Sequence, residues 1–154
     1  MDKSLIFLTM VFFHTIADYN LQGILASMKQ SQWWTEMFCD DMEKLSKRKD
    51  ILPEKVFEYK MNAIQDAFHK SHNDFIMALF MHSFSWAFMI MLPILYYYHF
   101  DTSMIGEAFY ISFAINTIIH MYVDHMKANM KKINLVTDQL IHLVQIAFTF
   151  ICLI

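Results

Sequence analysis

Three pairs of histidine and aspartate, each four residues apart, stand in otherwise apolar stretches of this chain. They are His14/Asp18, His120/Asp124 and, in the reverse order, Asp138/His142. Residues four apart lie one turn apart on the same helical face, so each pair directs both side chains the same way. Ionisable groups in apolar spans are costly and usually mark a function. The pattern predicts one buried polar site, to which His82 in another apolar stretch adds a seventh group.

The chemistry of these groups points to a metal. Imidazole nitrogen and carboxylate oxygen are the ligands of zinc, non-haem iron and manganese, and the absence of a thiolate argues against copper(I). We expect a divalent cation, zinc first, with iron or manganese as alternatives. The expected ligands are His14, His120, Asp138 and His142. Three aspartates and four histidines exceed one tetrahedral shell, so either some of them orient the ligands or the site holds two ions.

Further polar residues extend the predicted site. Asp18, Asp124 and His82 are expected to be ligands or bases beside them. Gln22, Gln139 and Lys127 are expected to face a substrate or to orient these groups by hydrogen bonding. A metal with an open position lowers the pKa of bound water, which then attacks an ester, amide or phosphoester. One of the three aspartates would serve as the general base.

Composition indicates the elements that must position these groups. The chain has 154 residues, 56% hydrophobic and only 18% charged, which is little charge for a soluble surface. Apolar runs long enough to cross a bilayer cover about 4–28, 73–98, 103–126 and 135–154. We therefore expect an all-α polytopic membrane protein, a single domain over 1–154 built as a four-transmembrane-helix bundle. The first run lacks a small-residue cleavage site, so it is not expected to be a signal peptide.

The distribution of charge predicts the topology. Eleven of the twelve Lys and Arg residues lie in the connections after the first and third spans. The positive-inside rule then places 29–72 and 127–134 in the cytoplasm of a bacterium and both termini outside its inner membrane. Antiparallel spans would bring the His/Asp groups to the cytoplasmic half, whereas the outer half holds no matching polar residues. Lysines at the cytoplasmic mouth would attract an anionic headgroup or phosphate, or simply anchor the helix ends.

The connection 29–72 is itself expected to be helical. Thr35–Lys49 is typical of a helix of mixed charge, and Pro53 marks the start of a second helix. That second helix carries an apolar stripe from Val56 to Phe68. The stripe would pack against the neighbouring helix or lie on the membrane surface, and both alternatives stay open.

The polar motifs resemble those of a family of small bacterial and phage integral membrane proteins of unknown function. The matching motifs are HxxxDxxxQ from His14 to Gln22, HxxxDxxK from His120 to Lys127, and DQxxH from Asp138 to His142. The resemblance implies a helical integral membrane protein with shared polar positions, and no activity. In chemistry the site is similar to membrane metal-dependent hydrolases such as the alkaline ceramidase superfamily, which is an analogy between sites.

Three functions are compatible with the pattern. The first is an intramembrane metal-dependent hydrolase, or a related lyase or transferase, acting on a lipid-linked or anionic substrate near the membrane. The second is a proton or ion relay or transporter, which four spans would form only as a homo-oligomer. The third is a non-enzymatic phage or bacterial effector whose cytoplasmic helices bind a host protein. The expected surroundings are the lipid bilayer, and no nucleic acid is expected as a partner.

Overall fold

Helices form all the regular structure in the part of the chain that the structure, a computed structural model, describes: residues 2–101 and 106–154. The all-α class is confirmed. In chain order the elements are α1 (Lys3–Thr15), the π-helix η1 (Ile16–Asn20), α2 (Leu25–Met28), α3 (Ser31–Ser46), α4 (Glu54–Ser71), α5 (Asp74–Asp101), α6 (Glu107–Ala128) and α7 (Leu135–Leu153).

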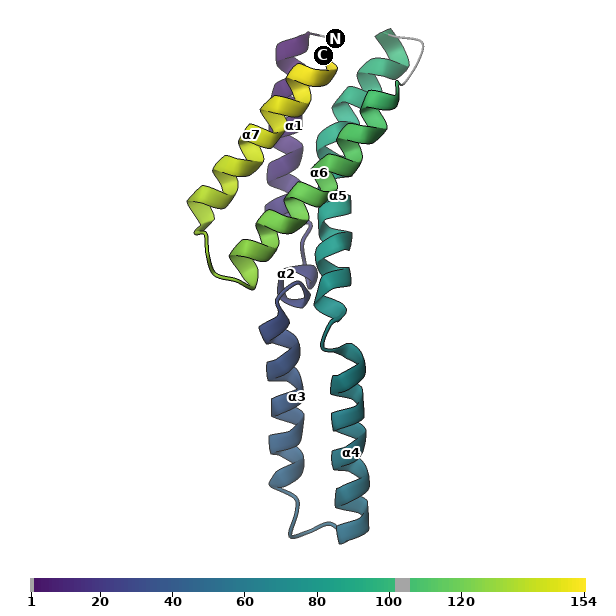
Figure 1. Cartoon of the computed structure of the whole chain (residues 1–154), viewed down its shortest axis with the longest axis vertical. Helices are drawn as coiled ribbons and strands as arrows, with labels where there is room; N and C mark the ends of the chain where they lie inside the picture. The colour runs from purple at the N-terminus through teal and green to yellow at the C-terminus, as the bar shows by residue number, and fades with distance from the viewer. Residues whose placement is uncertain (1, 102–105) are drawn as a thin grey trace.

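Four of these helices make a bundle and two make a hairpin. Helices α1, α5, α6 and α7 lie side by side, with α5 in contact with the other three. Helices α3 and α4 form an antiparallel hairpin that extends from one end of the bundle, whereas both ends of the chain lie at the other (Figure 1). Among the described residues, the bundle is the part where four helices enclose a core, so it is the part that is able to bury a site.

Local signals set several helix starts. The Asp2 carboxylate accepts a hydrogen bond from the Ser4 N–H at 3.2 Å before α1, and the Asn134 side chain accepts one from the Thr137 N–H at 2.9 Å before α7. Such caps satisfy backbone donors that have no partner within the helix. Pro53, predicted to mark a helix start, directly precedes α4. These signals are local, which is why the sequence alone reveals them.

The first predicted span, 4–28, is not one continuous helix. Helix α1 ends at Thr15, and a π turn follows in which the Leu21 N–H donates to the Ile16 carbonyl oxygen at 3.0 Å. Gly23 then adopts φ +48°, a left-handed conformation that favours glycine and ends the helical path. The π turn places one more residue in the turn than an α-helix does, and such turns are frequent at functional sites.

Two stretches of helix are long and apolar enough to cross a membrane. By length and composition they lie within Glu54–Phe100 and at Leu135–Leu153. The other two bundle helices fall short of that measure: α1 has 13 residues, against the roughly 20 that a bilayer requires, and α6 carries several polar side chains. The predicted four-span arrangement stays a prediction.

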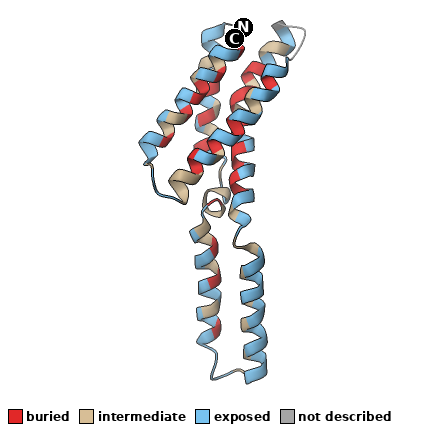
Figure 2. Ribbon diagram, in the orientation of Figure 1, coloured by how far each residue is buried: buried red, intermediate tan, exposed pale blue. Residues whose placement is uncertain are grey.

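The buried core of the bundle changes character along its length. The half near the chain ends is mainly apolar, with a core that includes Ile6, Met10, Ile90, Ile94 and Ile146. Buried positions are concentrated in the bundle and are few in the hairpin (Figure 2). Toward the hairpin the core becomes polar, and that half holds the His/Asp groups predicted from the sequence.

The hairpin packs on itself and is fastened to the bundle at its root. The rings of Phe38 and Phe68 meet edge to face, with centroids 5.4 Å apart, so the apolar stripe of α4 faces its neighbour α3. At the root, the Asn129 amide oxygen accepts from the Ser31 N–H at 2.7 Å, and its NH₂ group donates to the Lys29 carbonyl oxygen at 3.0 Å. One side chain from the end of α6 therefore joins both sides of the turn into α3.

Candidate metal centre

The seven predicted His and Asp groups form one buried cluster. They come from α1, η1, α5, α6 and α7, and none exposes more than 7% of its surface: His14, Asp18, His82, His120, Asp124, Asp138 and His142. Burial of so many ionisable groups is costly unless they pair with one another or bind an ion. The cluster is consequently the strongest candidate for a functional site in the described part of the chain.

Three overlapping sets within the cluster have the geometry of metal ligands. In each set three donor atoms lie within 4.8 Å of one another and all three residues are buried. The sets are Asp18/His82/His120, His120/Asp124/His142 and Asp18/Asp138/His142. These residues could hold a metal ion, whose identity the geometry leaves open between zinc, iron and manganese.

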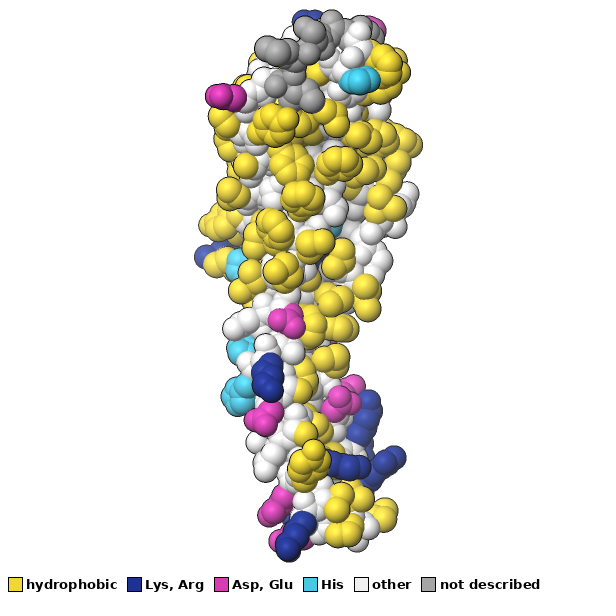
Figure 3. Space-filling model, turned by 90° about the vertical axis from the view of Figure 1, so that its right-hand side faces the viewer, with side chains coloured by type: hydrophobic (Ala, Val, Ile, Leu, Met, Phe, Trp, Pro, Cys, Tyr) yellow, Lys and Arg dark blue, Asp and Glu magenta, His cyan; other side chains and the backbone are white. Residues whose placement is uncertain are grey.

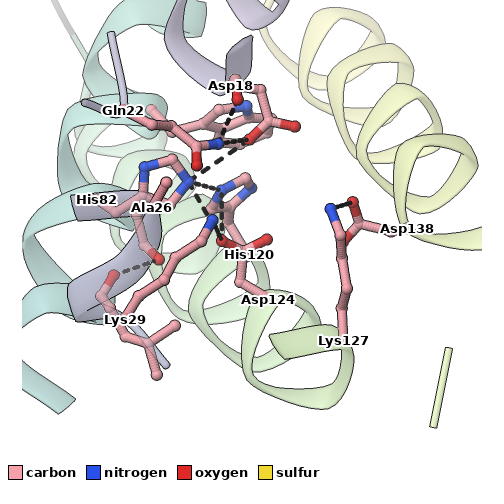
Figure 4. A network of polar contacts seen from close by, with 12 residues as sticks. Asp18, Gln22, Ala26, Lys29, His82, His120, Asp124, Lys127 and Asp138 are labelled. Atoms are coloured by element: carbon pink, nitrogen blue, oxygen red, sulfur yellow. Dashed lines mark hydrogen bonds and ion pairs between the residues drawn. The ribbon is translucent and has the colours of Figure 1, made fainter. Parts of the chain in front are cut away.

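The first donor set consists of Asp18, His82 and His120, joined by Asp124, and it gathers around the Nε2 atom of His82. That atom lies 3.2 Å from His120 Nε2, 3.2 Å from Asp124 Oδ2 and 3.5 Å from Asp18 Oδ1 (Figure 4). Four ligands at about 2.0–2.1 Å from a tetrahedral zinc ion are about 3.3 Å from one another. The three distances from His82 Nε2 are therefore close to the edge length of such a tetrahedron, and the His120 Nε2–Asp124 Oδ2 distance is longer at 3.9 Å.

The second donor set takes Asp124 and Asp138 from the other two sets, together with the His142 that those sets share. The His142 Nε2 atom lies 3.4 Å from Asp138 Oδ1 and 3.7 Å from Asp124 Oδ1. None of these three atoms has a hydrogen-bond partner among the described residues, although all are fully buried. Buried polar atoms without a partner are rare and call for an explanation such as an unseen ion.

Lysines contact one oxygen of each of two aspartates, and for Asp124 this is the same oxygen that lies near His82. Lys29 Nζ lies 2.6 Å from Asp124 Oδ2, and Lys127 Nζ lies 2.6 Å from Asp138 Oδ2. Lys29 is itself buried, with 7% of its surface exposed. Two ammonium groups face three buried carboxylates, of which Asp18 is the third. A bound cation or a protonated histidine would balance the remaining negative charge.

A chain of hydrogen bonds runs from Trp86 through His14 to two carboxylates. The Trp86 indole N–H donates to His14 Nδ1 at 2.8 Å, so His14 carries its proton on Nε2, which lies 3.0 Å from Gln139 Oε1. The Gln139 NH₂ group in turn donates to Asp18 Oδ2 at 2.6 Å and to Asp138 Oδ2 at 3.0 Å. Partners of this kind orient metal ligands.

His14 therefore takes a different place from the one expected. Both of its ring nitrogens are engaged, with Trp86 and Gln139, and it belongs to none of the three donor sets. Gln139 occupies the orienting position predicted for it. Gln22 does so too, since its NH₂ group donates to Asp18 Oδ1 at 3.0 Å and to the Asp18 carbonyl oxygen.

A cavity of about 410 Å³ lies beside the cluster. Asp18 and Asp124 contribute to its wall, as do the lysines Lys29, Lys127 and Lys131. Small and apolar side chains such as Ala26 and Leu135 complete the lining. The cavity thus brings positive charge to the carboxylates of the cluster and offers space for a small polar group.

Two groups of buried residues lie outside the set of site residues predicted from the sequence. Trp86 lies one turn beyond His82 on the same helix, so the spacing used for the His/Asp pairs could have revealed it. Asn116, Gln145 and Thr149 form a buried hydrogen-bonded group farther from the hairpin, where the sequence suggested no matching polar residues. Gln145 continues the stripe of Asp138 and His142 by one turn, but an amide does not titrate.

The remaining histidines stand apart from the cluster. The ring of His125 stacks on Phe75. His69 and His99 are exposed. Cys39 and Cys152 are free and exposed, so neither contributes a thiolate to the site.

No family model, curated protein or solved structure matches this chain. The resemblance of its motifs to the small membrane-protein family stays a prediction. The geometry of the His/Asp cluster must therefore carry the functional argument.

Proposed function

We propose that this chain is an intramembrane metal-dependent hydrolase, or a closely related lyase or transferase, acting on a lipid-linked or membrane-proximal substrate. One observation carries the proposal: buried imidazole and carboxylate atoms from several helices lie at the mutual distances of metal ligands, around His82 and around His142. Clustered ionisable groups in a cleft are typical of catalytic sites.

The surface of the bundle supports a location in the membrane. Large apolar side chains are exposed on all four bundle helices, as a space-filling view shows for one face (Figure 3). Examples are Leu8 at 64%, Phe88 at 48%, Ile118 at 67% and Phe148 at 68% exposed. Apolar patches of this extent are covered by lipid or protein in working proteins. We propose that α1, α5, α6 and α7 all cross the bilayer.

Charge supports the proposed orientation. Acidic and basic side chains gather over the hairpin, whereas the bundle above it is largely apolar (Figure 3). By the positive-inside rule the hairpin and the turn between α6 and α7 would face the cytoplasm. The cavity with its three lysines opens near the same end of the bundle, so a substrate would enter from the cytoplasmic side.

The proposed reaction adds water across an ester or phosphoester bond. The hydroxyl group of water joins the acyl or phosphoryl group, and the second proton of water goes to the departing alcohol oxygen. A bound cation would supply a more acidic water molecule and charge stabilisation. Asp18 borders the cavity and is positioned to accept the proton from water, while Gln22 and Gln139 hold its carboxylate.

Elemental analysis of purified protein in detergent tests the proposal. We expect stoichiometric divalent metal and hydrolysis of a lipid ester or lipid phosphate, both lost in His120→Ala and Asp124→Asn. Asp66→Asn, an exposed aspartate in α4, is the matched control and should keep both. Metal-free protein, together with unchanged hydrolysis in the His120 and Asp124 variants, would refute the proposal.

A proton relay is the second candidate, favoured by a specific contact chain. His120 lies 3.2 Å from His82 through the two Nε2 atoms and 3.2 Å from His142 through the two Nδ1 atoms. Three imidazoles in hydrogen-bond contact are able to pass protons. Proton flux into sealed vesicles, abolished by Asp124→Asn, would favour this function over hydrolysis.

A further inference from the structure

The cluster offers ligands for more than one ion. We infer that it holds two divalent cations with the Asp124 carboxylate between them, and that the pair takes a phosphate group as its ligand. The inference rests on the metal-dependent function proposed above. It goes further by assigning the number of ions, the bridging residue and the chemical class of the ligand.

Asp124 faces two different histidines with its two oxygens. Oδ2 lies 3.2 Å from His82 Nε2 and also accepts from Lys29 Nζ at 2.6 Å, whereas Oδ1 lies 3.7 Å from His142 Nε2. A carboxylate that presents one oxygen to each of two donor sets has the arrangement of a bridging ligand. Paired ions in two-metal enzymes stand about 3.5–4 Å apart, a span that a single carboxylate bridges.

The atoms of the second set lack any other partner. Asp124 Oδ1, Asp138 Oδ1 and His142 Nε2 are buried and make no hydrogen bond to described residues, and each of the two oxygens lies near His142 Nε2. By contrast, Asp138 Oδ2 is occupied by Lys127 and by Gln139. The protein thus holds one oxygen of Asp138 and leaves the other without a hydrogen bond beside His142.

The two donor sets are joined by a histidine pair. His120 presents Nε2 to the first set, and His142 presents Nε2 to the second, while their Nδ1 atoms lie 3.2 Å apart. One proton fits between two nitrogens at that distance. With both ions bound, the pair would therefore share a single proton and carry a negative charge, which offsets part of the charge of the second cation.

The cavity indicates the ligand. Asp18 and Asp124 border it, and three lysines line it: Lys29, Lys127 and Lys131. Ammonium groups bind phosphate as point charges, and a pair of cations stabilises both the attacking and the leaving oxygen of a phosphoester. A phosphate group fits this combination of charge better than a neutral ester does.

Manganese loading of the full chain in detergent tests the inference without relying on turnover. We expect two Mn²⁺ per chain and an exchange-coupled electron paramagnetic resonance spectrum. His82→Gln and His142→Gln should each reduce the content to one ion and give an uncoupled spectrum. Asp124→Asn should abolish the coupling. His125→Gln, in the same helix as Asp124 but outside the cluster, should keep two coupled ions.

Each contrary outcome has a distinct meaning. One ion in the unaltered chain, absent from both His82→Gln and His142→Gln, overturns the two-ion site and leaves the proposed function standing. No ion at all overturns both. Two coupled ions in His142→Gln show that His142 is a protonated partner of Asp138 instead of a ligand, which also overturns the inference. The spectrum of the unaltered chain tests for two ions even if none of the variants folds.

Phosphate binding is measured on the same loaded protein. Inorganic phosphate and an alkyl phosphate in the same micelles should change the coupled spectrum, and Lys131→Met should weaken that response without loss of metal. A stronger response to the alkyl phosphate identifies a lipid headgroup as the source, and a stronger response to inorganic phosphate identifies a soluble compound. No response to either overturns the assigned ligand class.

Discussion

Trp86→Phe removes the indole N–H that holds His14 and keeps an aromatic ring in the core. Trp86 is fully buried, and its ring stacks on His120 with centroids 4.1 Å apart. Without the indole, His14 Nδ1 becomes a buried acceptor with no donor, which costs about 1–3 kcal/mol. The lost volume, roughly 40 Å³, adds about 1 kcal/mol. We expect the free energy of unfolding to fall by about 2–4 kcal/mol.

The same change should reach the metal site through Gln139. His14 fixes the Gln139 amide, which in turn holds Asp18 and Asp138. Loss of such orienting partners lowers metal affinity by about 10–100-fold in other sites. We expect a decrease of that size for Trp86→Phe, measured by competition with a chelator of known affinity, alongside denaturant unfolding in detergent.

Trp34→Phe provides the matched control. Its indole N–H also makes one hydrogen bond, to the Met28 carbonyl oxygen at 2.8 Å, but at the root of the hairpin. Trp34→Phe should cost about 1–2 kcal/mol of stability and leave metal affinity unchanged. Equal metal affinity in Trp86→Phe and in the unaltered chain would refute the orienting role of His14 and Gln139, whatever the loss of stability.

Three other predictions concern the bundle and its orientation. Asn116→Ala removes hydrogen bonds between α6 and α7, including the one from the Asn116 NH₂ group to Thr149 Oγ1 at 2.9 Å. The free energy of unfolding, measured with denaturant, should fall by about 2–3 kcal/mol, and the metal content should stay the same. In Gly23→Ala the added Cβ has no atom within 4 Å, so only the left-handed backbone opposes the change. The variant should lose about 1 kcal/mol of stability, measured as a lower melting temperature. In intact cells a membrane-impermeant maleimide should label Cys152 and leave Cys39 unlabelled until the membrane is opened; the reverse pattern contradicts the proposed topology.

The convergence of the His/Asp groups was predictable because it depends on helical periodicity and antiparallel packing. His120/Asp124 and Asp138/His142 lie within regular α-helices, where a spacing of four places side chains on one face. The packing of α4 on α3 was one of two predicted alternatives, and the contact of their aromatic rings decides it.

The fine geometry was not predictable, because it depends on contacts between distant residues. The π turn around Asp18 has no signature in the sequence, and it interrupts the helix expected over 4–28. Whether His14 is a ligand or an orienting group is decided by Trp86, which lies 72 positions away in the chain. Periodicity predicts that His14 shares a helix face with Asp18, but it does not predict which residues form hydrogen bonds with the ring nitrogens of His14.

The hydrogen bonds of Asn129 couple the position of the hairpin to the buried ion pair between Lys29 and Asp124. Asn129 holds the carbonyl oxygen of Lys29 and the N–H of Ser31, and the Lys29 ammonium group lies 2.6 Å from Asp124. A tilt of the hairpin that breaks these two hydrogen bonds would let Lys29 move relative to α6. Force applied at the tip of the hairpin would therefore change the distance between the Lys29 ammonium group and the Asp124 carboxylate.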